Sequence, residues 1–443
     1  MVRTHAWARA PEASLSLESA TLSLLNGMAG TLGMLRRQFV PDRLVAIARR
    51  QTGLSDFGDA AFEDPLRRLL ESCVAEADLS VVGRLSIRWE AVRFLSNLLR
   101  LREAERRDPA ILGEPVAAPI FITGLPRSGT TFLHRLMMAD PANRAPLVWE
   151  TIYPYPLPAD ARRGADRRVE KVQGQLRAFE RIAPEFRSLH PLEARSPQEC
   201  GDINAHVFRS LRFETTYNIP SYRRWLDADG HVDAYRFHKR FLQHLQHQPG
   251  QGAGQPPRWV LKCPDHVFAL DAIRAVYPDA RLVFVHRDPV KVLLSVTRLT
   301  EVLRQPFTRR IDQVAIGRQE SARWLEGARR MMAVGDDAGL PEPVCHVHHM
   351  DLVSDPVATV QGVYRHFGLA LPEPAAIAID RLVAEKPNGG YGKHSYRFED
   401  HGLDGAAERA KFRDYMLRFG IATESTPPPG RSDAKLPEGL AIK

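Results

Sequence analysis

The spacing of apolar positions divides the chain into a helical first quarter and a longer part in which short apolar runs alternate with helical patterns. Over residues 1–110, apolar side chains recur every three or four positions, which is the period of an amphipathic helix. The pattern predicts helices at 17–35, 42–51, 65–77 and 82–106. We therefore predict a helical N-terminal extension over residues 1–115 that packs on the rest of the chain.

From residue 116 to residue 443 the pattern predicts an α/β domain. Short apolar runs predict strands at 120–122, 146–150, 258–261, 280–285 and 344–350, with helical patterns between them. The strand–helix–strand–helix order over 258–299 is typical of a right-handed βαβ unit in a parallel sheet. Within the domain, composition predicts a flexible loop at 246–257 and a loose tail at 424–443.

A glycine-rich turn within residues 119–138 carries the strongest chemical signal. The first apolar run leads into the loop Gly124-Leu-Pro-Arg-Ser-Gly129, and Thr130 and Thr131 begin an amphipathic helix. A strand, a glycine loop and a helix in this order point backbone N–H groups at an anion, and the helix dipole adds positive potential. The sequence therefore predicts an anion-binding loop here.

The loop differs from the Walker A pattern GxxxxGK[ST] at the position that decides its chemistry. Thr130 occupies the Lys position, and a cation appears earlier in the loop as Arg127. The Walker Lys contacts the β- and γ-phosphates, so its absence disfavours nucleoside triphosphate chemistry. A donor that carries a phosphate without a β/γ pair fits this loop better.

Other charged residues follow the predicted strands. Glu150, Lys262, His266 and Arg287 each close or follow one of the apolar runs. Ligands of open α/β sheets bind beyond the carboxyl ends of the strands. We therefore expect these four residues to share one rim of the sheet with the loop at 124–131.

Two blocks of sequence identify a family resemblance. The blocks are Gly124-Leu-Pro-Arg-Ser-Gly-Thr-Thr131, and Val285-His-Arg-Asp-Pro289 followed by Ser295. They resemble motifs of sulfotransferases that use PAPS (3′-phosphoadenosine 5′-phosphosulfate). The chain is more similar to the bacterial branch related to tyrosylprotein sulfotransferases than to the cytosolic aryl branch, and the likeness is clearest from residue 116.

The resemblance implies a parallel-sheet, P-loop-like sulfotransferase fold and a metal-independent reaction. The enzyme would move the sulfuryl group of PAPS to an acceptor hydroxyl or amine and release adenosine 3′,5′-bisphosphate. The rival hypotheses are an ATP-dependent, kinase-like enzyme on the same fold and a nucleotide-binding protein without catalysis. Metal-dependent ATP turnover would favour the first rival, and nucleotide binding without transfer would favour the second.

The resemblance also implies which residues hold the donor. The 5′-phosphosulfate would be held by the loop residues Arg127, Ser128, Gly129, Thr130 and Thr131. A pair with the spacing of Arg287 and Ser295 holds the 3′-phosphate in the family. The chemistry agrees, because a guanidinium binds phosphate with two hydrogen bonds and a Ser two helical turns later can reach the same group.

Two alternatives accompany these donor assignments. Arg287 could instead form a surface ion pair with Asp288. The segment Gly389-Gly-Tyr-Gly-Lys-His394 resembles a C-terminal loop that closes over the nucleotide, and this likeness places Lys393 on the 3′-phosphate. A plain flexible tail is the other interpretation of that segment.

The resemblance implies catalytic roles for four residues. Arg127 and Lys262 match the cations that stabilise the leaving group, and Glu150 matches the base carboxylate of the tyrosylprotein branch. His266 is the rival base, because the cytosolic branch uses a His shortly after the corresponding Lys. Glu150 could instead be a buried partner of Arg127 or Arg144, and His266 could be a core histidine.

Charge and composition add few further constraints. The 443 residues carry a net charge of +8, but the arginines are spread along predicted helices and no nucleic-acid motif accompanies them, so we predict no nucleic-acid partner. The four cysteines are scattered, and the histidines at 346, 348 and 349 have no partner ligands at metal-binding spacing. No apolar run has the length of a membrane span and no cleavable signal is visible, so we predict a cytoplasmic protein.

The sequence indicates the chemical class of the acceptor less clearly than that of the donor. Aromatic residues at 208, 213, 217, 222 and 225 could line a pocket for a small-molecule, lipid or glycan acceptor, or could belong to the core. The N-terminal helices could cap that pocket or form a contact in a homo-oligomer.

Overall fold

The computed structural model describes residues 39–156, 166–185, 192–248, 256–334, 339–385 and 397–424. Several predicted features lie outside the described residues. They are the helix at 17–35, most of the loop at 246–257, Lys393 with its glycine-rich segment, and the tail beyond residue 424.

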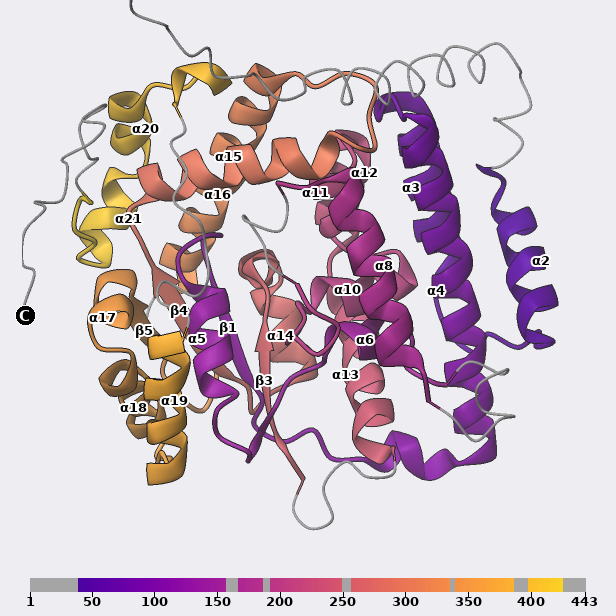
Figure 1. Cartoon of the computed structure of the whole chain (residues 1–443), viewed down its shortest axis with the longest axis horizontal. Coiled ribbons are helices and arrows are strands. Elements are labelled where there is room, and N and C mark those ends of the chain that lie inside the picture. Colours follow the sequence, from indigo (N-terminus) through magenta and orange to yellow (C-terminus); the bar gives the residue numbers. More distant parts are fainter. Residues whose placement is uncertain are drawn as a thin grey trace, which may run out of the picture.

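The described residues form a five-stranded parallel sheet in the order β2-β3-β1-β4-β5 (Figure 1). The strands are β1 (Ile120–Gly124), β2 (Asn143–Arg144), β3 (Arg258–Lys262), β4 (Arg281–His286) and β5 (Cys345–His348). β1 lies at the centre, where Ile122 pairs with Lys262 of β3 and Gly124 pairs with Val285 of β4. The predicted α/β fold with a parallel sheet is confirmed.

Helices surround the sheet on both faces. The N-terminal elements are α2 (Pro41–Thr52), α3 (Glu63–Glu76), α4 (Val81–Arg107) and the 3₁₀ turn η2 (Pro109–Gly113). α5 (Thr130–Met137) lies between β1 and β2. After β2 come α6 (Val148–Ile152), α8 (Arg168–Ile182), α10 (Gly201–Asn204), η3 (Ala205–Val207), α11 (Arg212–Thr216), α12 (Pro220–Asp229) and α13 (Val232–His247).

The remaining helices follow the last three strands. They are η4 (Pro264–Phe268), α14 (Leu270–Val276), α15 (Pro289–Arg304), α16 (Gln313–Val334), α17 (His349–Ser354), α18 (Pro356–His366), α19 (Glu373–Glu385), η6 (Glu399–His401), α20 (Gly405–Lys411) and α21 (Arg413–Arg418).

Alternate side chains of each strand enter different cores, as expected for a sheet covered on both faces. Ile122 and Val285 pack with α5, α18 and α19 on one side. Phe121 and Phe284 join a larger core on the other side, which includes residues of α4, α13 and α14. The sheet is therefore a buried platform whose carboxyl edge carries the loops described below.

The N-terminal helices belong to the larger core. α4 begins at the N-cap Ser80, whose side chain accepts a hydrogen bond from Gly83 N, and more than half of its length is buried. Leu44 of α2 and Leu66 of α3 are fully buried in the same cluster as Phe121 of β1. The helices at 42–51, 65–77 and 82–106 therefore form where predicted, while a domain boundary at residue 115 stays a prediction.

The predicted strand at 146–150 is wrong, because this segment turns into the short helix α6. Glu150 closes the first turn by accepting a hydrogen bond of 2.8 Å from Leu147 N. The N–H groups of Val148 and Trp149 donate to the carbonyls of Ser196 and Ala194, each at 3.0 Å. A short apolar run does not distinguish a buried strand from a buried helical turn, and the edge strand is instead β2.

Candidate active site

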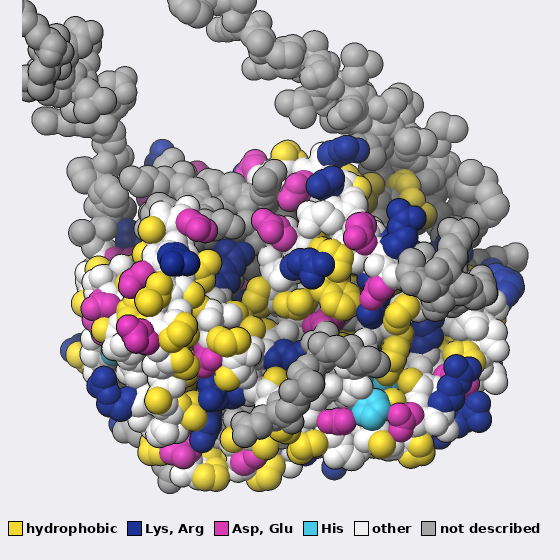
Figure 2. Space-filling view, turned by 60° about the horizontal axis from the view of Figure 1, so that its bottom comes forward, with side chains coloured by type: hydrophobic (Ala, Val, Ile, Leu, Met, Phe, Trp, Pro, Cys, Tyr) yellow, Lys and Arg dark blue, Asp and Glu magenta, His cyan; other side chains and the backbone are white. Residues whose placement is uncertain are grey.

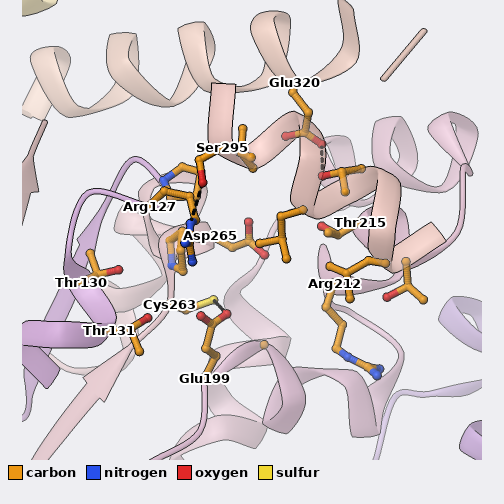
Figure 3. A pocket seen from close by; sticks show the side chains of 18 of the residues that line it. Arg127, Thr130, Thr131, Glu199, Arg212, Thr215, Cys263, Asp265, Ser295 and Glu320 are labelled. Atoms are coloured by element: carbon orange, nitrogen blue, oxygen red, sulfur yellow. Dashed lines mark hydrogen bonds between the residues drawn. The ribbon is translucent and has the colours of Figure 1, made fainter. Parts of the chain in front are cut away.

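A cavity of about 1410 Å³ opens at the carboxyl ends of β1, β3 and β4. It is lined by the loop after β1, by residues that follow β3 and β4, and by side chains of α4, α8 and α15. Figure 3 shows part of this lining, with Arg127 and Ser295 above Glu199 and Cys263. The cavity thus lies at the edge of the sheet where the sequence predicts that a ligand binds.

The loop after β1 contains three unusual backbone positions. Gly124 has a φ of 147°, and a Cβ there would overlap the carbonyl oxygen of Val285. Gly129 has a φ of 104°, and a Cβ there would lie 3.0 Å from His349 Nδ1. Arg127 has a φ of 62°, a left-handed conformation that costs a non-glycine residue about 1–2 kcal/mol. The surrounding structure therefore holds the loop in a shape that its local preferences oppose.

The structure brings together three residues that the sequence predicts to bind the donor. Arg127 Nε donates to Ser295 Oγ over 3.0 Å, the contact drawn in Figure 3. Arg287 Nη1 donates to the carbonyl oxygen of Arg127 over 2.9 Å. All three line the cavity, together with Gly129, Thr130 and Thr131. Residues about 160 positions apart in sequence thus form one cationic cluster, which we call the donor end of the cavity.

The loop also contains a buried hydroxyl whose hydrogen-bonding capacity is unused. Ser128 is fully buried, and within the described residues its Oγ has no hydrogen-bond partner. His349 Nδ1 lies 3.1 Å from the carbonyl oxygen of Ser128 and donates to it when the ring is neutral. Burial and the nearby Arg287 lower the pKa of His349 to about 4, so the ring is neutral at pH 7.

Glu424 holds Arg287 in a bidentate ion pair. Arg287 Nε and Nη2 donate to the two carboxylate oxygens of Glu424, both at 2.9 Å, and Glu424 N donates to Asp288 Oδ2 at 2.9 Å. Burial opposes ionisation of Glu424, but Arg287, His349 and Lys291 outweigh it and leave the pKa of this carboxyl below its usual value. Glu424 is the first residue of the predicted loose tail at 424–443, whose other residues lie outside the described ranges. No local sequence pattern indicates this pairing, because Glu424 lies 137 positions after Arg287.

Lys262, the last residue of β3, lies behind the donor loop and pairs with Glu199. Its Nζ donates to Thr131 Oγ1 over 3.1 Å and forms a close ion pair with the Glu199 carboxylate. The Lys262 side chain is 2% exposed, whereas that of Glu199 is 30% exposed and lines the cavity. Sequence reasoning missed Glu199, which lies on an irregular segment that joins β3 through a hydrogen bond from Cys200 N to the carbonyl of Lys262.

The structure places Glu150 away from the cavity, in contact with Arg144. Glu150 Oε1 accepts from Arg144 Nη2 at 3.2 Å, and Oε2 accepts from Leu147 N at 2.8 Å. The side chain is 4% exposed, and burial raises the pKa of Glu150 despite the opposing charge of Arg144. Among the described residues that line the cavity, Glu150 is absent. This placement matches the alternative role of a buried partner of Arg144.

The structure places His266 in the core. Its Nδ1 forms a short hydrogen bond with the hydroxyl of Tyr235, and its ring packs edge-on against Phe121. His266 is 1% exposed and faces a separate small cavity of about 20 Å³. Burial drives the pKa of His266 well below its ordinary value, so the ring is neutral. This placement matches the alternative role of a core histidine.

The opposite part of the cavity, which we call the acceptor end, has an apolar wall. The wall consists of Trp89, Ile152, Leu176, Phe179, Leu303 and Phe307. The rings of Phe179 and Phe307 are nearly parallel, with an interplanar angle of 9° and centroids 6.1 Å apart. Of the aromatic residues at 208–225, Tyr217 lines the cavity, whereas Phe208, Phe213 and Tyr222 are buried in the core.

Charge is mixed over the surface, and metal-binding geometry is not found. Figure 2 shows basic and acidic side chains interspersed over the visible face, without one basic block. Across the described ranges, no three His, Cys, Asp or Glu residues lie close enough to hold a metal ion. In the same ranges, no helix combines the length and the apolar character needed to span a bilayer.

Comparison with known proteins identifies the family. The sulfotransferase family model matches residues 119–373, which is more than half of the chain and includes both motif blocks. The chain therefore belongs to the sulfotransferase family. The predicted resemblance to PAPS-dependent sulfotransferases and the predicted sulfotransferase activity are confirmed, while the branch within the family stays a prediction.

Individual relatives agree with this assignment. The omega-hydroxy-beta-dihydromenaquinone-9 sulfotransferase Stf3 of Mycobacterium bovis is 25% identical over 308 residues, which cover 66% of this chain and 70% of the relative. Sulfotransferase STF1 from Mycobacterium tuberculosis is 30% identical with a TM-score of 0.70, covering 84% of this chain and 98% of that structure. Sulfotransferase STF9 from Mycobacterium avium is 25% identical with a TM-score of 0.76, covering 87% and 98%.

Proposed function

We propose that this sulfotransferase moves the sulfuryl group of PAPS to a hydroxyl of a lipid-like alcohol and releases adenosine 3′,5′-bisphosphate. The observation that carries the donor assignment is the contact among Arg127, Arg287 and Ser295 at the donor end of the cavity. Arg287 and Ser295 recognise the 3′-phosphate, and the loop from Arg127 to Thr131 holds the 5′-phosphosulfate. A donor with a phosphate at each end of its ribose fits a site with an anion loop and a separate Arg/Ser pair.

The loop has hydrogen-bonding capacity that suits the phosphosulfate. Ser128 Oγ is buried without a partner in the described parts of the chain, and an incoming oxygen anion can accept its hydrogen. Glycine at 129 permits the left-handed turn that leads into α5, and a side chain at this position would meet His349. The first N–H groups of α5 follow directly at Thr130 and Thr131, where the helix dipole favours negative charge.

The chemistry is an in-line displacement at sulfur. The acceptor oxygen attacks, and the bond between sulfur and the 5′-phosphate oxygen breaks with its electron pair moving to the phosphate. Negative charge therefore grows on the leaving phosphate and on the sulfuryl oxygens. Fixed cations and N–H donors lower the barrier when they face that charge, and Arg127 and Lys262 are the cations beside the loop.

The apolar wall supports a lipid-like acceptor. Six apolar side chains from four helices and an adjoining turn face the same cavity as the donor end, so an apolar chain can be buried there while its hydroxyl reaches the phosphosulfate. The name of the relative Stf3 gives an omega-hydroxylated dihydromenaquinone, an apolar molecule with a hydroxyl, as its acceptor. An alcohol on an apolar chain is the acceptor class that both observations favour.

Calorimetric titration tests the donor, and a transfer assay tests the acceptor. Adenosine 3′,5′-bisphosphate, titrated without metal, should bind the wild type with micromolar affinity and bind Arg287→Ala at least 100-fold more weakly. ATP with magnesium is the control, and equal binding of ATP would favour the kinase-like alternative. Transfer of labelled sulfate from PAPS to long-chain alcohols, but not to short alcohols or monosaccharides, would establish the acceptor class. Donor binding without transfer to any acceptor would favour a catalytically silent protein.

A further inference from the structure

The two side chains that the sequence predicts as bases, the Glu150 carboxylate and the His266 imidazole, do not face the cavity. Glu150 has both oxygens engaged by Arg144 and Leu147, and His266 is buried against Tyr235. Proton removal requires a base within hydrogen-bonding reach of the acceptor hydroxyl. A different residue must therefore receive the proton if the transfer uses a side-chain base.

We propose that Glu199 is the catalytic base and that Lys262 holds its carboxylate until the donor binds. This inference rests on the proposed function. Glu199 lines the cavity and pairs with Lys262, and Lys262 also contacts Thr131 of the donor loop. In the view of Figure 3, Glu199 projects between Thr131 on the donor side and Arg212 on the opposite wall.

The ion pair links donor binding to activation of the base. Lys262 Nζ lies 3.1 Å from Thr131 Oγ1, so a phosphosulfate oxygen held at Thr131 competes with Glu199 for the same ammonium group. When the donor engages Lys262, the Glu199 carboxylate loses its strongest counter-charge and becomes more basic. The enzyme then acquires its base at the moment when a sulfuryl group is present to be transferred.

The proton and the electrons balance in this step. The acceptor O–H proton passes to the Glu199 carboxylate as the acceptor oxygen forms its bond to sulfur. The bond between sulfur and the 5′-phosphate oxygen breaks, and its electron pair stays on that oxygen beside Lys262 and Arg127. After the bisphosphate leaves, Glu199 releases its proton to solvent and pairs with Lys262 again.

The electrostatic surroundings of Glu199 are mixed in sign. The charged groups that interact with it include Lys262 of β3, Asp202 of α10 and Asp265 of η4. The neutral titratable groups near it include Cys200, Cys263 and His134 of α5, and burial lowers the pKa of His134 to about 3. The acidic neighbours Asp202 and Asp265 favour uptake of a proton by Glu199 once Lys262 is engaged elsewhere.

The substitution Glu199→Gln keeps the shape of the side chain and removes its basicity. We expect kcat to fall about 10²- to 10⁴-fold, while adenosine 3′,5′-bisphosphate binds at least as tightly as to the wild type, because Lys262 no longer has a competing carboxylate. The acidic limb of the pH profile of kcat should disappear in this variant. Glu199→Asp should recover part of the lost rate, and Glu193→Gln, an exposed position on the same segment, should match the wild type.

Each contrary result has a distinct meaning. A kcat of Glu199→Gln within tenfold of the wild type would overturn the proposal. A large fall in kcat that keeps the acidic limb would also overturn it, because Glu199 would then act by positioning Lys262. Failure of the wild type to bind the bisphosphate would instead refute the proposed donor, so the two failures can be distinguished.

Discussion

The donor end and the acceptor end of the cavity are built from the chain in different ways. The donor end takes Arg127 to Thr131 from one loop, and Arg287 and Ser295 from one strand–helix junction. The acceptor end takes its apolar wall from α4, α6, α8, α15 and the turn after α15, elements that are widely separated along the chain. The cationic lining of the cavity is therefore concentrated in two short segments, whereas the apolar wall needs contributions from many elements.

Of three further substitutions, Phe179→Ala in the apolar wall is expected to have the largest effect. Phe179→Ala removes a ring that packs in parallel with Phe307. Loss of the Phe179 ring should raise the acceptor KM about 10- to 100-fold, because burying a large apolar side chain against a ligand contributes about 1.5–3 kcal/mol. Steady-state kinetics with a long-chain alcohol would measure the change, and calorimetry should show the affinity for adenosine 3′,5′-bisphosphate unchanged.

Leu382→Ala is the matched control for the apolar wall. Leu382 is an exposed residue of α19 that does not line the cavity, and its truncation should change neither constant. If Phe179→Ala weakened donor binding as strongly as acceptor binding, the donor end and the acceptor end would not bind their ligands independently.

A smaller effect in the opposite direction is expected at the donor end. Glu424→Gln removes the carboxylate that binds Arg287, and this carboxylate must leave before a 3′-phosphate can take the same guanidinium. The bisphosphate should bind about threefold to tenfold more tightly, since a partly buried bidentate pair contributes about 1 kcal/mol. Calorimetry would detect this change, and 5′-AMP, which has no 3′-phosphate, should bind both proteins equally.

Weaker binding of the bisphosphate to Glu424→Gln would contradict this competition and would show that Glu424 orients Arg287 for the donor. Glu399→Gln offers a control, because Glu399 is also an acidic residue of the C-terminal part and its described ion pair is with Arg397, not with Arg287.

The smallest effect concerns the pH dependence of donor binding. The pKa of His349 is lowered to about 4, so the neutral ring persists from pH 8 to pH 6 and gains a proton only as the pH approaches 4. The ratio of bisphosphate dissociation constants for the wild type and His349→Asn should therefore stay constant between pH 6 and pH 8. A ratio that changed near pH 6.5 would show that His349 titrates normally and strengthens phosphate binding as a cation.

The contrast between the two ends also explains what the sequence could predict. The loop at 124–131 and the Arg287/Ser295 pair were predictable because each lies on a contiguous strand–turn–helix segment with strict backbone requirements, such as the left-handed glycine at 129. The central strands β1, β3 and β4 were predictable because each contains a short apolar run, whereas the edge strand β2 is the polar pair Asn143–Arg144 and shows no such pattern. Local patterns of this kind indicate which segments form the donor end, but not the contacts between them.

The features that the sequence did not predict depend on contacts between distant positions, which no local sequence pattern indicates. The apolar run at 146–150 predicts a strand that ends at Glu150, but the hydrogen bond from Leu147 N to Glu150 makes this residue part of a helical turn. Glu199 meets Lys262 across 63 positions, and Glu424 meets Arg287 across 137 positions. Opposite charges are frequent in any sequence, so neither pairing could be chosen over its competitors before the fold was known.

The path of α4 limits how this chain can be shortened or recombined. The helix precedes the segment that matches the family model, yet it supplies Trp89 and Arg93 to the cavity and buries Phe94, Leu95 and Leu98 in the core. A fragment that began at residue 116 would expose the apolar core side chains that α4 covers, and we expect this fragment to aggregate. Any exchange of acceptor preference between relatives would therefore have to transplant this helix together with the wall that it completes.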